Sequence, residues 1–338
     1  MEQRLLGSSG VYVSVIGLGT WPMGGTWWGK PDDDESVRTI HRALELDVTL
    51  YDTSPLYGLG HAEDVLARAI AGRRQDIVIS DKVPYTELQP EQVRANFEAS
   101  CQRLNTDYLD IYFVHWPHVD VPIGSTMEAL ERLRREGRIR AIGVSNFCLE
   151  EMIEAQEYGR VDVLQPPCNM FWRYIEQLEI PYCLEHNIGI MTYSSLAQGL
   201  LTGTLSKETR FAQDDSRTTT VLFQPEHYGR CIDAVEQLRP IAHQYGKSIA
   251  QLAINWVTNR PGVTTALVGA RTVADIEENA GGAGWATSEK DTERAGSVTR
   301  TVLGNLPEYP DMFRRYARLE MEQRRHRKWG RKTEYLPS

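Results

Sequence analysis

The stretch that decides the fold runs from Ile77-Val78-Ile79-Ser80-Asp81-Lys82 to Asp110-Ile111-Tyr112-Phe113-Val114-His115. Between these two runs, apolar residues from Val93 to Leu104 recur at the three- and four-residue spacing of one helix face. A strand, an amphipathic helix and a second strand at this spacing are typical of a parallel pair joined by a right-handed crossover. Each run also ends on an ionisable side chain, Lys82 or His115.

The same unit repeats in both directions along the chain. Eight strand-like runs are expected, at residues 15–19, 49–52, 77–82, 110–115, 139–145, 163–168, 189–193 and 265–268. Eight repeats favour closure into a (β/α)8 barrel, a TIM barrel of the α/β class. An open doubly wound sheet that binds a dinucleotide is disfavoured, because neither Gly17-Leu18-Gly19 nor Gly58-Leu59-Gly60 continues as GxGxxG. Residues 4–6 and 11–13 predict an N-terminal β-hairpin that closes the bottom of the barrel.

Composition limits the classes of function. The 338 residues are 41% hydrophobic and 25% charged, and the formal net charge of −9 argues against nucleic acid as a partner. No run of about 18 apolar residues is present, so we expect no membrane span. The first residues are too polar for a signal peptide, and the five cysteines show no CxxC spacing. We therefore expect free thiols and a cytoplasmic protein.

Two segments lack the periodicity of the barrel. Residues 199–228 are rich in Thr, Ser, Asp and Gln, and we interpret them as a mobile loop over the barrel mouth. We assign residues 1–302 to the barrel and 303–338 to a basic, helical C-terminal tail, in which residues 314–332 hold nine Arg or Lys against two Glu. This tail is interpreted first as an arm that docks on an acidic neighbouring subunit of a homo-oligomer, and otherwise as a solvated helix or an anion-binding lid.

Four ionisable side chains fall at the carboxyl ends of strands, where α/β barrels carry their functional residues. Asp52, Lys82 and His115 end three consecutive strand-like runs, and Tyr57 follows the first of them by five residues. Reduction of a carbonyl needs a proton donor at the oxygen, and an ammonium beside a phenol lowers the pKa of the phenol. We therefore expect Tyr57 to be the general acid/base and Lys82 to lower its pKa. Asp52 would anchor Lys82, and His115 would orient the substrate oxygen.

Several motifs together resemble the aldo-keto reductase family, in its bacterial, potassium-channel beta-subunit-like branch. They lie at residues 52–58, 80–83, 114–117, 143–147 and 193–201. The family's Asp–Tyr–Lys–His tetrad falls on Asp52, Tyr57, Lys82 and His115. The resemblance implies an extended nicotinamide dinucleotide that lies across the carboxyl ends of the strands.

By the same resemblance, Ser145, Asn146 and Gln165 would bind the nicotinamide carboxamide, and Tyr193 would stack on its ring. The loop after Tyr193 would hold the pyrophosphate, and the segment after residue 268 would meet the adenosine. The full set of implied cofactor residues is Gly19, Thr20, Ser145, Asn146, Gln165, Tyr193, Ser194, Leu196, Ala197, Gly199, Gly269, Ala270, Arg271, Asp275, Glu278 and Asn279.

The choice between NADP(H) and NAD(H) rests on residues that point in opposite directions. Asp275 stands where relatives often have Arg or Gln, and its carboxylate would repel a 2′-phosphate and accept from a 2′-hydroxyl. Arg271 suits a phosphate. Thr204 replaces a basic residue that many relatives carry. Because the family more often uses NADP(H), we expect NADP(H) slightly ahead of NAD(H).

Aromatic residues follow several strand-like runs. The expected substrate pocket consists of Trp21, Trp27, Trp28, Trp116, Phe171 and Trp172. Such a rim suits a sugar, a polyol or an aryl carbonyl, although loop packing alone explains some of these rings. The acidic run Asp32-Asp33-Asp34-Glu35 is interpreted as the solvated start of the first helix. His115 and His118 lack the HExxH pattern and a third ligand, so no metal site is expected.

The sequence therefore predicts an NAD(P)(H)-dependent oxidoreductase. It would transfer a hydride between a nicotinamide and an aldehyde, ketone or secondary alcohol, with no nucleic acid or membrane as a partner. The alternative is a cofactor-sensing binding or regulatory protein with little turnover, in which the basic tail is the interaction surface. Tight cofactor binding without reduction of any carbonyl compound in a panel would favour that alternative.

Overall fold

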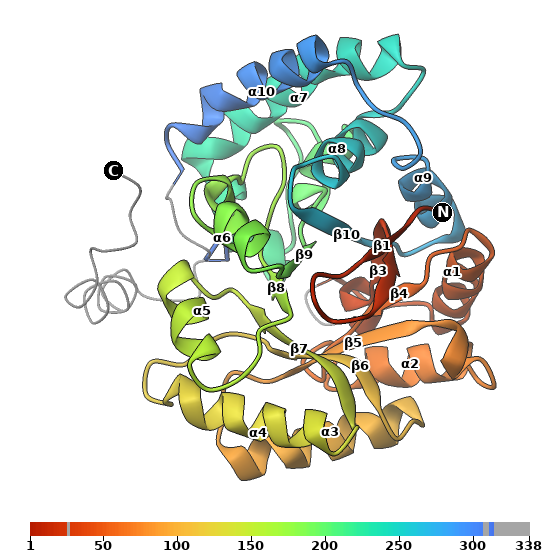
Figure 1. Cartoon of the computed structure of the whole chain (residues 1–338). Helices are drawn as coiled ribbons and strands as arrows, with labels where there is room; N and C mark the ends of the chain where they lie inside the picture. The colour runs from red at the N-terminus through yellow and green to blue at the C-terminus, as the bar shows by residue number, and fades with distance from the viewer. Residues whose placement is uncertain (26–27, 307–310, 314–338) are drawn as a thin grey trace.

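The computed structural model describes residues 1–25, 28–306 and 311–313. Eight parallel strands form a closed barrel in the order β10-β3-β4-β5-β6-β7-β8-β9 (Figure 1). The barrel strands are β3 (Ile16–Gly19), β4 (Leu50–Asp52), β5 (Val78–Val83), β6 (Leu109–Val114), β7 (Ile139–Ser145), β8 (Val163–Gln165), β9 (Gly189–Thr192) and β10 (Val263–Gly269). Each overlaps one of the eight expected runs, so the prediction of a TIM barrel is confirmed.

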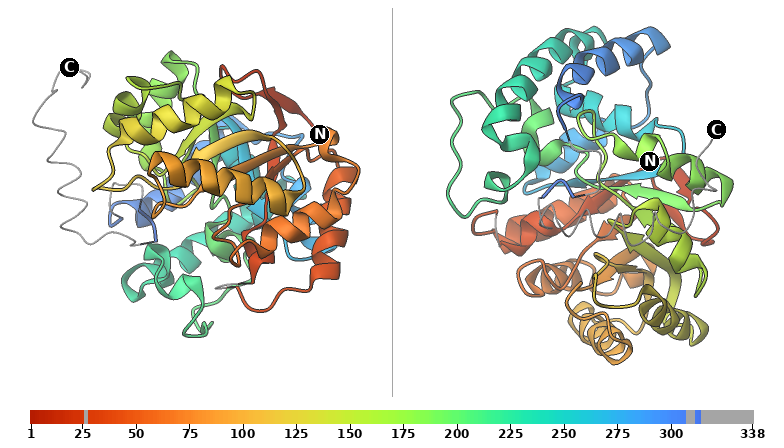
Figure 2. Two further views of the ribbon diagram at one scale, coloured as in Figure 1. Left: turned by 90° about the horizontal axis from the view of Figure 1, so that it is seen from below. Right: turned by 90° about the vertical axis from the view of Figure 1, so that its left-hand side faces the viewer.

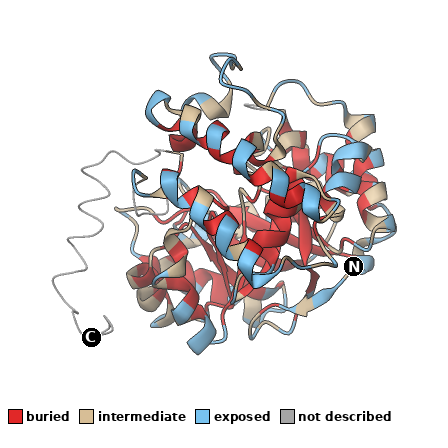
Figure 3. Ribbon diagram, turned by 90° about the horizontal axis from the view of Figure 1, so that it is seen from above, coloured by how far each residue is buried: buried red, intermediate tan, exposed pale blue. Residues whose placement is uncertain are grey.

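Helices surround the strands on the outside of the barrel (Figures 1 and 2). They are α1 (Asp33–Glu45), α2 (His61–Ala69), α3 (Pro90–Leu104), α4 (Ile123–Arg135), α5 (Leu149–Gln156), α6 (Glu179–Glu185), α7 (Pro225–Gln244), α8 (Ile249–Thr258), α9 (Val273–Ala280) and α10 (Glu289–Leu303). Most of these helices have a buried inward face and an exposed outward face, whereas α8 is buried on nearly all sides (Figure 3). In α3, for example, the buried side chains include Val93, Phe97 and Leu104, the stripe that the sequence predicts.

A two-stranded antiparallel hairpin, β1 (Gln3–Leu5) and β2 (Tyr12–Ser14), closes the barrel at the amino ends of its strands. Buried apolar residues of the hairpin join the cluster that fills the barrel interior, which includes Leu50 at the start of β4. Gly7, in the hairpin turn, has φ 55°, and a Cβ on it would lie 2.3 Å from the backbone nitrogen of Gly189. Only glycine fits this contact, because it has no Cβ and tolerates positive φ.

The segment predicted as a loop over the barrel mouth is more regular than expected. It contains the 3-10 turns Ala197–Thr202, Ser216–Thr218 and Val221–Phe223, and α7 already begins at Pro225. The basic stretch 314–332 lies outside the described residues, so the interpretations of the tail stay predictions. In the part of the chain that the structure describes, no helix is both long and apolar enough to cross a bilayer.

Candidate active site

The carboxyl ends of the barrel strands open into one cavity of about 1070 Å³. It is lined by Asp52, Tyr57 and His115, and also by Arg271 and Asn279, which follow β10. This volume is slightly above the usual range of small-molecule sites, which extends to about 1,000 Å³. Segments far apart in the chain therefore share one space at the end of the barrel where α/β barrels place their chemistry.

Asp52, Lys82 and Tyr57 form a connected group at this cavity. Lys82 Nζ lies 2.6 Å from Asp52 Oδ2, 2.8 Å from Thr53 O and 3.3 Å from Tyr57 Oη, so all three ammonium protons have an acceptor. Lys82 is fully buried and Asp52 nearly so. A buried ion pair is tolerated only when its remaining donors and acceptors are satisfied. The network therefore holds the ammonium in a fixed place beside the phenol.

The turn that carries Tyr57 is positioned by two glycines. Gly58 has φ 68°, and a Cβ on it would lie 2.0 Å from Gly24 O. A Cβ on Gly24 would in turn lie 2.5 Å from the carbonyl carbon of Tyr57. The turn after β4 therefore packs directly on the 3-10 turn Trp21–Gly24. Because of this close approach, the Trp21 ring stacks on the Tyr57 ring, and the centroids of the two rings are 6.1 Å apart.

His115 directly follows β6, and it lines the cavity beside Tyr57. The centroids of the two rings are 6.1 Å apart, and their planes are nearly perpendicular, at 84°. His115 Nδ1 lies 3.3 Å from Ser54 Oγ, a contact that fixes the orientation of the imidazole. The structure thus brings together Asp52, Tyr57, Lys82 and His115, the four side chains expected to converge.

The pKa of Tyr57 departs from the sequence prediction. Burial raises the pKa of Tyr57 well above 10, and the negative charges of Asp52 and Asp81 raise it further. The expected lowering by Lys82 does not prevail in the free protein, because desolvation and the charge of Asp52 both favour the neutral phenol. Tyr57 therefore carries its proton throughout the neutral pH range.

Asp81 points to the other side of β5 from the Lys82 side chain, as strand alternation predicts. Its Oδ1 accepts a hydrogen bond from the backbone nitrogen of Lys82 at 2.7 Å. Burial and repulsion from Glu63 raise the pKa of Asp81, while the hydrogen bond from the Lys82 backbone nitrogen opposes this. Asp81 thus lies apart from the phenol of Tyr57, on the other side of the strand.

The residues that the resemblance assigns to the nicotinamide meet at the ends of β7, β8 and β9. Tyr193 Oη donates to Asn146 Oδ1 at 2.6 Å, and Asn146 Nδ2 donates to Ser145 Oγ at 3.0 Å. Gln165 Nε2 donates to Asp52 Oδ1 at 2.9 Å, which ties this amide to the buried ion pair. The sequence did not predict this link, because it joins residues 113 positions apart. Ser145, Asn146, Gln165 and Tyr193 all line the cavity.

Most of the other implied cofactor residues also line the cavity. These are Gly19, Ser194, Leu196, Gly199, Gly269, Arg271, Asp275, Glu278 and Asn279. Thr20, Ala197 and Ala270 are buried and do not line it. Thr20 instead supports the site, because its backbone nitrogen and its hydroxyl both donate to Asp52 O, at 2.9 and 3.1 Å.

The loop after β9 has an unusual backbone where it borders the cavity. Ser194, Ala197, Gln198 and Gly199 all have positive φ, of 58°, 48°, 51° and 96°. Such strain in non-glycine residues persists only where the surroundings enforce it, and it is concentrated at functional sites. The Gln198 side-chain oxygen is buried here and has no hydrogen-bond partner within the described residues, which leaves an acceptor for a ligand.

Asp275 sits in the first turn of α9, at the part of the cavity assigned to adenosine. Its Oδ2 accepts from the backbone nitrogens of Arg271 and Thr272 at 2.9 and 3.1 Å. Thr272 Oγ1 in turn accepts from the Asp275 nitrogen at 3.1 Å, which completes a capping box. The carboxylate is therefore fixed at the helix start, within the cavity lining.

The expected substrate pocket is only partly formed by the predicted aromatic residues. Trp21, Trp28 and Trp116 line the cavity. Phe171 and Trp172 do not, and their expected place in the pocket is wrong, because both are packed in the hydrophobic core with at most 1% of their surface exposed. Trp27 lies outside the described residues.

Sequence reasoning missed other residues that line the cavity. Phe313, from the chain beyond α10, lines it, and residues 213–219 of the expected mouth loop do so as well. No strand end or periodicity marks Phe313, since it follows the last barrel element. Only the position of the loop over the mouth was predicted, not the residues that reach the cavity.

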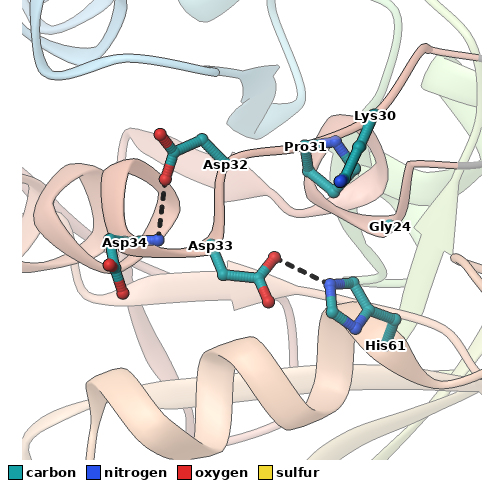
Figure 4. A pocket seen from close by; sticks show the side chains of 7 residues that line it. All are labelled: Gly24, Lys30, Pro31, Asp32, Asp33, Asp34 and His61. Carbon is teal, nitrogen blue, oxygen red and sulfur yellow. Dashed lines mark hydrogen bonds and ion pairs between the residues drawn. The ribbon is translucent and has the colours of Figure 1, made fainter.

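A smaller hollow lies beside the start of α1 (Figure 4). Asp33 Oδ1 and His61 Nε2 point toward each other across it, 2.8 Å apart, and Asp32 Oδ1 accepts from the backbone nitrogen of Asp34 at 3.0 Å. Asp32 is the N-cap of α1, so the acidic run is confirmed as a helix start. Capping and the pair with His61 account for these charges, so no ligand is needed to explain them.

The closed α/β barrel, with the buried Asp52–Lys82 pair beside Tyr57 at its mouth, is the arrangement expected of a barrel-type oxidoreductase. The sequence matches the model of the "Aldo/keto reductase family" over residues 15–298. The chain therefore belongs to the aldo-keto reductase family.

Curated relatives support this assignment. The aldo-keto reductase YhdN of Bacillus subtilis is 36% identical and covers 90% of this chain and 96% of its own length. The NADH-specific methylglyoxal reductase of Escherichia coli is 33% identical, over 82% of this chain and 92% of its own. A probable voltage-gated potassium channel subunit beta of Arabidopsis thaliana is 31% identical, over 82% and 90%. The expected branch of the family is thereby confirmed.

Solved structures give the same result. The glycerol dehydrogenase AKR11B4 from Gluconobacter oxydans superposes with a TM-score of 0.83 and 32% identity, over 90% of this chain and 97% of its own. An aldo/keto reductase from Klebsiella pneumoniae, in complex with NADP and acetate, has a TM-score of 0.72 and 28% identity, over 93% and 99%.

Proposed function

We propose that this protein catalyses reversible hydride transfer between a nicotinamide dinucleotide and a carbonyl compound or the corresponding alcohol, with Tyr57 as the general acid/base. The observation that carries this proposal is the contact of Lys82 Nζ with both Asp52 Oδ2 and Tyr57 Oη at the floor of the large cavity. The contact joins a phenol that carries its proton to a fixed positive charge, in the same space as the residues assigned to the cofactor.

The residues would act in a simple sequence. The nicotinamide, when bound, supplies the hydride for reduction and accepts it in oxidation. In reduction, Tyr57 Oη donates its proton to the substrate oxygen as the C=O bond becomes a C–O–H group. Lys82 stabilises the phenolate that this transfer leaves, and Asp52 holds Lys82 in place. His115 orients the substrate oxygen, and in oxidation the same phenolate takes the proton back.

The described residues fit a nicotinamide dinucleotide. The buried side-chain oxygen of Gln198 lacks a partner, and the amides of Asn146 and Gln165 border the same cavity. These groups supply acceptors and donors for an amide and for phosphate-linked sugars. Ser194 and the strained loop that follows would border the pyrophosphate.

For the choice of cofactor we propose NADP(H) slightly ahead of NAD(H). The NADP complex of the Klebsiella protein and the exposed Arg271 support NADP(H). The NADH-specific Escherichia coli relative and the fixed carboxylate of Asp275 support NAD(H). Dissociation constants for NADPH and NADH, measured side by side, decide between them.

The substrate class we propose is a small carbonyl compound or polyol, or an aryl carbonyl. Three tryptophans, Trp21, Trp28 and Trp116, line the cavity beside polar groups, as a site for a sugar-like or flat molecule requires. The names of the relatives, a glycerol dehydrogenase and a methylglyoxal reductase, support small oxygen-rich substrates. We keep the cytoplasm as the proposed location because none of the five cysteines, all within the described residues, forms a disulfide.

The alternative, a regulatory protein that senses the cofactor, rests on the basic tail and on the likeness to a probable channel beta subunit. The discriminating experiment has two steps. Titration of tryptophan fluorescence with NADPH and NADH tests cofactor binding, and turnover of glyceraldehyde, methylglyoxal and aryl aldehydes tests catalysis. Binding with turnover supports the enzyme, binding without turnover supports the regulator, and no binding refutes both.

A further inference from the structure

Phe313 enters the catalytic cavity from the end of the described chain. Its ring stacks on Tyr193, with a centroid distance of 6.1 Å and planes only 7° from parallel. The same ring meets Trp21 edge-on, with a centroid distance of 5.7 Å and an interplanar angle of 86°. Figure 1 draws this short segment, residues 311–313, as a blue piece between grey traces.

The contacts place the Phe313 ring between Tyr193 and Trp21 in the cavity. Trp21 in turn stacks on the catalytic Tyr57 with a centroid distance of 6.1 Å. Phe313 therefore lies in the part of the cavity that joins Tyr193 to Tyr57. A hydride donor must lie in that same part, because hydride and proton are delivered to neighbouring atoms of one carbonyl group.

The space between the two rings is too small for a third ring. Carbon atoms in contact lie about 3.5 Å apart, so a flat ring inserted between two parallel rings needs about 7 Å between the outer pair. Tyr193 and Phe313 are 6.1 Å apart between centroids. A nicotinamide ring stacked on the face of Tyr193 that Phe313 covers thus competes with Phe313 for the same surface.

We propose that Phe313 is a residue of the cofactor site that occupies the nicotinamide's place on Tyr193 in the free protein and is displaced when the dinucleotide binds. The proposal rests on the proposed function, since it needs a nicotinamide on Tyr193. Phe313 then sets the cofactor affinity, because a ligand that binds only the displaced state sees its apparent affinity reduced by the fraction of molecules in that state.

The segment that carries Phe313 is anchored to the 3-10 turn Val221–Phe223. Met312 is fully buried, and its carbonyl oxygen accepts a hydrogen bond from the backbone nitrogen of Val221 at 2.9 Å. Asp311 is also buried, with 1% of its surface exposed. Displacement of Phe313 therefore requires either a rotation of its side chain or a local release of this anchor.

The test is calorimetric titration of the full-length protein with NADPH and with NADH. The variants are F313A, which removes the ring, and F313L, which keeps an apolar side chain of similar volume but no flat face. The matched control is Y182A, which removes a half-buried ring on α6 that pairs with His186 and does not line the cavity. Circular dichroism confirms that each variant is folded.

F313A is expected to lower Kd for both cofactors by the same factor, about 3- to 10-fold, since the two aromatic contacts that hold the ring in place are lost. F313L is expected to fall between F313A and the wild type, and Y182A to equal the wild type. Unchanged or weaker binding by F313A and F313L, with normal binding by the wild type, overturns the inference and leaves the proposed function intact. Absence of binding by every form overturns both.

Discussion

Lys82 Nζ donates a hydrogen bond to Asp52 Oδ2 at 2.6 Å, and both side chains are buried. Removing two charges from water is costly, and a buried pair survives only when its other polar atoms are satisfied. Here Asp52 Oδ1 accepts from Ser80 Oγ at 2.7 Å and from Gln165 Nε2, while Lys82 also donates to Thr53 O. These contacts together hold the Lys82 ammonium in a fixed position beside Tyr57.

The pair is expected to be strongly coupled in stability. K82M leaves the Asp52 carboxylate buried without its cation, and D52N leaves the Lys82 ammonium without its anion, so each single variant should lose about 3–5 kcal/mol of unfolding free energy. The double variant removes both charges and should recover most of that loss. Chemical denaturation of all four proteins measures the coupling.

Activity should behave differently from stability in the same set of variants. All three variants lack the charged network beside Tyr57, so none of them should turn over a carbonyl substrate at a wild-type rate.

The stability measurements have a result that would contradict the prediction. Additive losses of stability in the double variant, in place of recovery, would mean that the two side chains do not stabilise each other.

Replacement of Tyr57 by Phe should abolish proton transfer while the ring stays in place. Turnover should fall by about 10²- to 10⁴-fold, the usual contribution of a general acid. Calorimetry should give a Kd for NADPH close to that of the wild type. The matched control is Y51F, which removes the hydroxyl of the buried tyrosine that precedes Asp52 and contacts Ile40 O at 3.5 Å. Full activity of Y57F would refute the proposed mechanism.

The pH dependence should differ between the two directions of the reaction. Because burial raises the pKa of Tyr57 well above 10, the phenol stays protonated at neutral pH and remains ready to donate. The rate of reduction should therefore be flat from about pH 6 to 9, whereas oxidation, which needs the phenolate, should rise by up to about tenfold per pH unit. A fall in the reduction rate with a midpoint below pH 8 would show instead that Lys82 lowers the pKa of Tyr57.

The sequence was sufficient for the barrel and for the convergence of the tetrad. The strands from Val78 to Val83 and from Leu109 to Val114 are marked by Val, Ile, Tyr and Phe residues, and every residue of both strands is buried, because both faces of a barrel strand are covered. Once eight such runs close into a barrel, residues at their carboxyl ends must share one rim. That geometric rule brings Asp52, Lys82 and His115 together without any knowledge of side-chain packing.

What the sequence could not supply depends on packing between distant segments. Phe171 and Trp172 follow a strand end just as Trp116 does, yet they turn into the core, and no local pattern distinguishes the two outcomes. Phe313 reaches the cavity from beyond the last helix, so no strand-end rule applies to it. The raised pKa of Tyr57 depends on the desolvation of its phenol by the surrounding residues and on the charge of Asp52, which are properties of the folded molecule.

A buried carboxyl outside the site should make stability depend on pH. Burial raises the pKa of Glu179 from 4.5 to about 7, against backbone hydrogen bonds from its own nitrogen and from Leu149. Because the folded state holds the proton more tightly than the unfolded state, stability should be greatest below about pH 4.5 for this group and fall by about 3 kcal/mol as the pH rises through 7. E179Q should remove that loss, so its unfolding free energy at pH 8 should exceed that of the wild type.

Denaturation of E179Q and the wild type at pH 5, 6, 7 and 8 measures this effect. The matched control is E176Q on the same side of the barrel, since Glu176 is paired with Arg173 at 2.8 Å and is partly exposed. The difference between E179Q and the wild type should grow with pH. A constant difference at all four pH values would show that Glu179 ionises normally.

Asp275 and Arg271 should control cofactor preference in opposite directions. The Asp275 carboxylate is fixed in the cavity lining by the backbone nitrogens of Arg271 and Thr272, so it is expected to repel a 2′-phosphate. D275N keeps an oxygen for those two hydrogen bonds and removes the charge. It should shift the ratio of dissociation constants toward NADPH by about tenfold, which is on the order of 1.4 kcal/mol.

R271A should move the same ratio toward NADH, because it removes the cation that suits a phosphate. The matched control is E277Q, which neutralises a carboxylate on the same helix that pairs with Arg42 at 2.8 Å and does not line the cavity. E277Q should leave the ratio unchanged. The shift caused by D275N should also shrink as salt is added, since added salt screens the interaction between exposed charges. The Debye length is about 8 Å at physiological ionic strength and becomes shorter above it. Equal changes in both dissociation constants for D275N would mean that Asp275 acts by capping α9 and does not read the 2′ position.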